Sequence, residues 1–207
     1  MSDKILTKEI AEQFMTDHEE VELNEFTSME DEAAESLSKF PGEINGDPAP
    51  AELYLDGLTE LSSSAAESLS KVQATLSLNG IMGLGTQTAK SLAMFQGHSL
   101  FLGITTTSDL VAKIMSGFKC GQLWLSLTEI SDEAAESLSQ FKGMLGLNGL
   151  SELSDAGAKS LSKHSGEDLH FSTEIEISDL AMNYLSEYKG EINCMDPKEW
   201  LESMKDG

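Results

Sequence analysis

The chain repeats one short pattern along most of its length. Residues 53–62, LYLDGLTELS, return as residues 145–154, LGLNGLSELS, and residues 31–38, DEAAESLS, return unchanged at 132–139. Each copy contains an LxL motif, and the first apolar residues of successive motifs are 22 to 24 residues apart: Leu53, Leu76, Leu100, Leu123, Leu145, Leu169 and Ile192. A constant period of this length predicts a solenoid, in which each repeat packs on the next.

The spacing of the apolar residues changes within each copy. Leu76 and Leu78 alternate with a polar residue, as in a strand, whereas Ile130, Ala134 and Leu138 have helical spacing. A hydroxyl side chain precedes the helical segments and is expected to accept a hydrogen bond from the first helical turn: Thr7, Ser131, Ser154 and Ser178. We therefore expect an α/β fold with one strand and one helix in each repeat.

We interpret residues 1–207 as a single solenoid domain with different structures at its two ends. Residues 1–20 match the helical half of a repeat and are expected to form an N-terminal capping helix. Residues 21–195 hold the repeats. Residues 196–207 are expected to form a C-terminal capping helix, because Asp196-Pro197 is typical of a helix start.

The first repeat is irregular. Its strand is expected at Val21, but the next anchor, Leu53, follows only after 32 residues. An irregular loop near residues 43–51 accounts for the excess. Ile44 in this loop fits a short abbreviated strand and a plain surface loop equally well.

The repeated text resembles the leucine-rich repeat family, in particular its divergent arrays in planctomycete-type bacteria, whose units read roughly LxLxGLTxLSDEAAExLAKxKG. The resemblance covers residues 21–195 and implies a horseshoe-shaped solenoid, with a parallel sheet on its concave side and helices on its convex side. It also implies an interaction scaffold without catalytic activity. The family's usual asparagine slot holds Leu58, Ile81 and Leu150 here, so the turn after each strand must be stabilised in another way.

The composition is strongly acidic, with 36 Asp and Glu against 13 Lys and Arg and a net charge of −23. Nucleic-acid binding and adhesion to an anionic membrane both need basic surface, so we expect neither. The charge either favours a basic partner or serves solubility alone. The chain also has no apolar signal segment or membrane-spanning stretch, which predicts a cytoplasmic protein.

No motif indicates an enzyme, a cofactor or a metal site. The two cysteines are too few for a disulfide framework, and we expect Cys194 in the core and Cys120 in a more exposed turn. The four histidines are scattered, and no second ligand lies at metal spacing from His170. The sequence leaves open whether the acidic surface binds calcium.

Residues between the strand leucines should point away from the core and form columns across the sheet. The central column holds Tyr54, Phe101, Trp124 and His170, and Asp56 lies in the adjacent column. Exposed aromatic side chains are common anchors of protein interfaces. The alternative interpretation is that these rings only pack across neighbouring strands.

These observations predict a protein- or peptide-binding scaffold that uses the concave strand face, with Tyr54, Phe101, Trp124, His170 and Asp56 as contact residues. The alternative is an acidic inhibitor or immunity-type protein that binds a basic partner by charge mimicry. The sequence does not indicate an oligomeric state.

Overall fold

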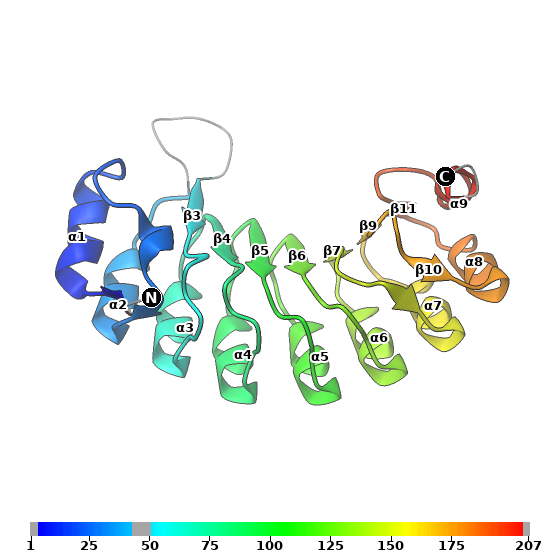
Figure 1. The fold of residues 1–207 in the computed structure, drawn as a ribbon, viewed down its shortest axis with the longest axis horizontal. Helices are drawn as coiled ribbons and strands as arrows, with labels where there is room; N and C mark the ends of the chain where they lie inside the picture. The colour runs from blue at the N-terminus through cyan, green and yellow to red at the C-terminus, as the bar shows by residue number, and fades with distance from the viewer. Residues whose placement is uncertain (1–3, 43–50, 205–207) are drawn as a thin grey trace. The chain divides into compact units, whose positions relative to one another are not determined.

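The computed structural model describes residues 4–42 and 51–204 and divides the chain into two compact units. Residues 1–104 with 118–121 form the first unit, and residues 105–117 with 122–207 form the second. In both units short parallel strands alternate with helices along the chain (Figure 1). The predicted repeated α/β architecture is therefore present in each unit.

In the first unit the helices line up side by side in chain order and the main strands form a separate layer (Figure 1). The helices are α1 (Lys8–Thr16), α2 (Asp31–Leu37), α3 (Ser63–Leu69) and α4 (Thr86–Leu92). The main strands are β3 (Glu52–Tyr54), β4 (Thr75–Leu78) and β5 (Ser99–Leu102), which pair in parallel in that order. A separate parallel pair joins β1 (Ile5–Leu6) to β2 (Ser28–Met29).

In the second unit the helices of the repeats again lie side by side, and the main strands form a separate layer (Figure 1). Its helices are α5 (Asp109–Met115), α6 (Asp132–Leu138), α7 (Asp155–Leu161), α8 (Asp179–Leu185) and α9 (Pro197–Ser203). Its main strands pair in parallel in the order β6 (Gln122–Leu125), β7 (Met144–Leu147), β9 (Asp168–Phe171) and β11 (Glu191–Ile192). The short strands β8 (Glu152–Leu153) and β10 (Glu176–Ile177) form a second parallel pair.

The core consists of the strand leucines and the paired helix alanines. Leu123 and Leu125 of β6 are buried, whereas Gln122 and Trp124 between them are only partly buried. Ala134 and Ala135 of α6 are completely buried, and their small side chains bring the helix close to the sheet. The predicted alternation of inward leucines and outward variable residues is present in β6, whereas all four residues of β4 are buried.

The helices are short, since those of the repeats span seven residues and α1 spans nine. Isolated helices of this length are marginal in water, so packing between repeats must stabilise them. Within residues 4–42 and 51–204, no helix has the length and apolar character needed to cross a bilayer.

At α3, α6, α7 and α8, the N-cap serine links the helix to the preceding one. The Ser131 hydroxyl accepts a hydrogen bond from the Ala134 N–H at 3.0 Å and lies 2.5 Å from Asp109 Oδ1, to which it donates. Asp109 is the first residue of α5, so one hydroxyl caps α6 and ties it to its neighbour. The same link joins Ser154 to Asp132, Ser178 to Asp155 and Ser62 to Asp31. The first Asp of the repeated acidic segment DEAAES therefore has a structural role.

The turn after β4 is stabilised by Asp56, a side chain of the preceding repeat. The Asp56 Oδ1 atom accepts hydrogen bonds from the Asn79 N–H at 2.8 Å and from the Ser77 hydroxyl at 2.6 Å. Asn24 Oδ1 accepts in turn from the Asp56 N–H at 2.9 Å. A Cβ at Gly80 would lie 2.3 Å from the Asp56 carbonyl oxygen, so only glycine permits this close approach of repeats. These contacts replace the missing asparagine ladder.

Two expectations for the N-terminal region are wrong. Residues 21–23 do not form a strand, because the chain enters a 3₁₀ helix at Leu23–Glu25 and leaves Val21 only partly buried. Thr7 precedes α1, but its hydroxyl donates to Glu9 and makes no capping bond to the backbone. The irregular loop predicted near 43–51, with Ile44, lies outside the described residues except for Ala51, which is buried.

Helix α9 (Pro197–Ser203) begins at the Asp196-Pro197 pair. Asp196 accepts a hydrogen bond from the Lys198 N–H, and Pro197 occupies the first helical position of α9. Trp200 and Leu201 are buried, and the Trp200 ring contacts Phe171 with 5.8 Å between ring centroids. Helix α9 thus covers the end of the second unit's core.

We predict that Ser131→Ala lowers the free energy of unfolding by about 1–2 kcal/mol, because it removes a helix cap and an inter-helix bond together. Ser137→Ala in the same helix is the matched control and should change it by less than about 0.5 kcal/mol. Chemical denaturation of both variants measures the difference. Equal stability of the two variants would contradict a structural role of the Ser–Asp links.

Candidate functional site

The outward positions of the main strands form what we call the strand face. In the second unit, Trp124 lies across this face instead of projecting from it. The register pairs Trp124 with Gly146 on β7, and Gly146 with His170 on β9. A Cβ at Gly146 would lie 2.1 Å from Trp124 Cε3, so the indole occupies the space that a side chain would take. The ring reaches over Gly146 to His170, with 4.9 Å between ring centroids. Glycine at this position therefore creates an aromatic–imidazole pair.

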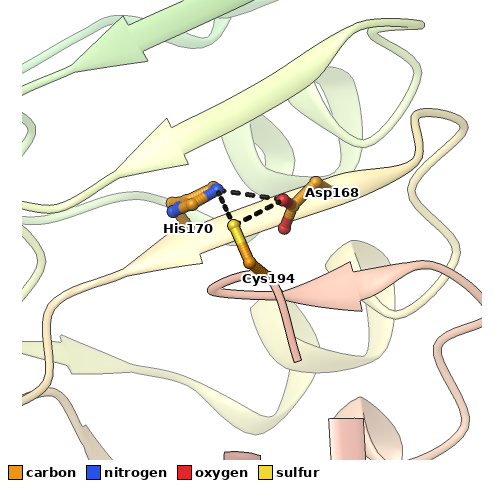
Figure 2. Close-up of side chains that lie close together, drawn as sticks. All are labelled: Asp168, His170 and Cys194. Atoms are coloured by element: carbon orange, nitrogen blue, oxygen red, sulfur yellow. Dashed lines mark hydrogen bonds and ion pairs between the residues drawn. The ribbon is translucent and has the colours of Figure 1, made fainter. Parts of the chain in front are cut away.

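His170 belongs to a second group, with Asp168 and Cys194 (Figure 2). His170 Nε2 lies 3.0 Å from Asp168 Oδ2, and both side chains come from alternate positions of β9. Cys194 Sγ lies 3.6 Å from the same carboxylate oxygen and 3.9 Å from the same nitrogen. Three different ligand types thus meet at one end of the strand face.

A tight turn after β11 places Cys194 in this group. Asn193 and Cys194 have φ values of 53° and 60°, and mutual backbone hydrogen bonds join Ile192 to Met195 across them. This left-handed conformation is uncommon for residues other than glycine, and asparagine tolerates it better than cysteine does. The Asn193 amide also bonds the backbone N–H and C=O of Phe171, which fixes the turn against β9.

Asp168 is the buried member of the group. It is 7% exposed, and its Oδ1 atom is buried without a hydrogen-bond partner among the described residues. Within the described chain, its one ion-pair partner is His170, which is charged only when protonated. Burying a carboxylate without a cation is costly, so this site favours the arrival of positive charge.

His164 lies beneath this region as a structural residue. It is 6% exposed, and its two ring nitrogens lie 3.3 Å from the Ser139 carbonyl oxygen and 3.0 Å from the Gly143 carbonyl oxygen. Burial lowers the pKa of His164 below its usual value, although the two carbonyls and the Asp168 charge oppose this shift. Its nitrogens are occupied by the backbone, so it is not available to a ligand.

In the first unit, Tyr54 and Phe101 share one column with the buried Ser77 between them. Tyr54 is 44% exposed, and Phe101 is half-buried. The Tyr54 hydroxyl donates to Glu52 at 2.5 Å, and this bond raises the pKa of the phenol. Asp56, predicted as a contact residue, uses Oδ1 to hold the turn that follows β4. The structure thus brings Trp124 and His170 together in one unit and aligns Tyr54 with Phe101 in the other.

Both cysteines have the reverse of their predicted exposure. Cys194 is exposed, because β11 ends after two residues and the chain turns before the second LxL position. Cys120 is 4% exposed, and burial raises the pKa of its thiol to about 12. The group of Asp168, His170 and Cys194 was missed for the same reason. The Asp-x-His spacing on one strand was the available signal, but the third member depends on the turn.

The geometry of the group does not suit a thiol–imidazole–carboxylate relay. Such a relay uses the two nitrogens of the histidine for two different partners. Here Nε2 of His170 faces both Cys194 and Asp168. The negative charge of Asp168 also raises the pKa of the Cys194 thiol, whereas a nucleophilic cysteine needs a lowered pKa. The three atoms converge on one point, as ligands of a shared species do.

We predict that a thiol reagent such as DTNB modifies one cysteine, Cys194, in the folded protein and both after denaturation. Asp168→Asn removes the charge that raises the Cys194 pKa, so it increases the thiolate fraction and the rate near pH 8. The difference should vanish at alkaline pH, where Cys194 is fully ionised in both proteins. Modification of Cys120 in the folded state would contradict the assignment.

A second prediction concerns the position of the Trp124 ring. Gly146→Ala forces the indole off the strand, which should increase acrylamide quenching of its fluorescence, while the buried Trp200 contributes a constant background. Gly83→Ala is the matched control, because a Cβ there meets no atom within 4 Å. Unchanged quenching in Gly146→Ala would show that Trp124 does not rest on Gly146.

Comparisons with known proteins add no relative to this geometry. A scan against protein-family models and searches of the curated proteins and the solved structures found no match.

Proposed function

We propose that the chain is a non-enzymatic binding scaffold of the leucine-rich-repeat type, and that its strand face binds an extended, basic segment of a partner protein. The observation that carries the proposal is the Trp124 ring held over Gly146 against His170. The repeated strand–helix pattern supports the scaffold, since such units commonly present binding surfaces on their strands.

The Trp124–His170 pair is suited to binding because it is ordered and partly exposed at the same time. The Trp124 Nε1–H donates to Gln122 Oε1 at 3.2 Å, which fixes the ring at its polar edge. The indole also packs directly on Gly146. The Trp124 side chain therefore has little conformational freedom left to lose on binding. Rigid, accessible Trp side chains are frequent anchors in protein interfaces.

The charges around the pair favour a basic segment. The outward positions of the second unit's main strands carry no lysine, while Asp168 and Glu191 contribute carboxylates: Gln122, Trp124, Met144, Gly146, Asp168, His170 and Glu191. A lysine or arginine of the partner can approach the exposed Glu191 carboxylate and also the face of the indole, while the buried Asp168 adds its negative charge. The net charge of −23 adds long-range attraction for such a segment.

We predict that selection from a library of random linear peptides yields binders that combine an apolar residue with Lys or Arg. Trp124→Ala should weaken such a peptide by about tenfold or more, because it removes the anchor. Met94→Ala, which truncates an exposed side chain of the first unit, is the control and should leave affinity unchanged. Isothermal titration calorimetry provides the measurement.

The salt dependence of the same titrations separates an anchored segment from pure charge mimicry. Raising the salt concentration from 0.1 to 1 M shortens the screening length from about 10 Å to about 3 Å. Binding anchored by Trp124 should persist in part at high salt. Binding that disappears with salt and is equal in Trp124→Ala would instead support the acidic-inhibitor function.

A further inference from the structure

The donor atoms of Asp168, His170 and Cys194 have the spacing of ligands around a small ion. A tetrahedral zinc ion separates a nitrogen and an oxygen ligand by about 3.3 Å, and a sulfur from either by about 3.5 Å. The corresponding distances here are 3.0 Å, 3.6 Å and 3.9 Å. Adjustments of about 0.4 Å or less would complete three corners of the tetrahedron.

The electrostatics of the group also favour a cation. The Asp168 carboxylate is buried, and no lysine of the described chain lies within ion-pair distance of it. Its Oδ1 atom has no hydrogen-bond partner within residues 4–42 and 51–204, and its Oδ2 atom faces the two other donors. An ion between the three side chains would neutralise the carboxylate at the point where the protein itself supplies no permanent positive charge.

We propose that Asp168, His170 and Cys194 bind one divalent transition-metal ion, with zinc the ion that best fits the donor set. Thiolate and imidazole ligands favour zinc over calcium and magnesium, which prefer oxygen ligands. Three protein ligands leave a fourth position for water or for a group of a partner. Cys194 is exposed, so this position is open to solvent.

Binding converts the Cys194 thiol into a thiolate and releases its proton to the buffer. The Asp168 charge opposes this ionisation in the free protein, because it raises the pKa of the thiol. The ion reverses the effect, since its positive charge lies next to both groups. Affinity for the metal should therefore fall as pH falls.

The test is a titration of the reduced, chelator-treated protein with Co²⁺, followed by displacement with Zn²⁺. We expect one ion per chain, a thiolate-to-cobalt charge-transfer absorption in the near ultraviolet, and loss of that absorption when zinc is added. Calorimetry in two buffers of different ionisation enthalpy should report the proton released from the thiol at pH 8.

Cys194→Gly is the decisive variant, because glycine accepts the left-handed backbone conformation and removes only the ligand. We expect it to abolish the cobalt absorption and to weaken zinc binding by at least tenfold. Asp168→Asn and His170→Gln should each weaken it as well. Cys120→Ala is the control, and it should retain the absorption and the stoichiometry.

The proposal is overturned if the wild-type protein shows no charge-transfer absorption, or if the absorption survives in Cys194→Gly and disappears in Cys120→Ala. Binding of zinc that is equal in wild type and Cys194→Gly would also overturn it, since exposed carboxylates would then be the ligands. The proposed metal site and the proposed peptide-binding surface can be tested independently of each other. Trp124→Ala should bind metal normally, and Cys194→Gly leaves the Trp124 anchor in place.

Discussion

Burial of the strand leucines against the helix alanines is the interaction on which the rest of the structure depends. A seven-residue helix and a four-residue strand cannot form a stable core alone, so each repeat needs its neighbours. Parallel pairing in constant register keeps the leucines inside and aligns the variable positions outside. The strand face is therefore the part of the repeat where residues can change without loss of the core, and the candidate sites lie there.

Much of this arrangement was predictable, because it depends on local patterns. Alternation marked the buried leucines, and serines such as Ser131 marked helix starts. The dipeptide Asp196-Pro197 marked the last helix. The outward position of Trp124 and His170 also followed from alternation. The contact between Trp124 and His170 could not be predicted, because it requires the indole to lie along the sheet over Gly146. An alignment of the repeats shows Gly146 only as one of several residues at a variable position.

The proximity of Asp168, His170 and Cys194 could not be predicted from the sequence, and the reason is physical. Asp168 and His170 are two residues apart on one strand, but Cys194 reaches them only because β11 stops after Ile192. The continued LxL pattern predicts a longer strand with the cysteine inside. Asn193 and Cys194 instead adopt positive φ values and end the strand. Their sequence does not indicate a left-handed turn, as an Asn-Gly pair would. The prediction of a strand at Val21 was wrong for a similar reason, because the LxL pattern alone does not distinguish a strand from a 3₁₀ helix.

The turn at Asn193 and Cys194 also determines what the edge of β11 presents. Glu191 and Asn193 direct their N–H groups toward carbonyls of the preceding repeat, at Glu167 and Leu169. The N–H and C=O of Ile192 point the other way, and both are bonded to Met195. The outer edge of β11 therefore has no free backbone groups at Ile192 for another chain to pair with, and the chain's own backbone protects this edge of the sheet.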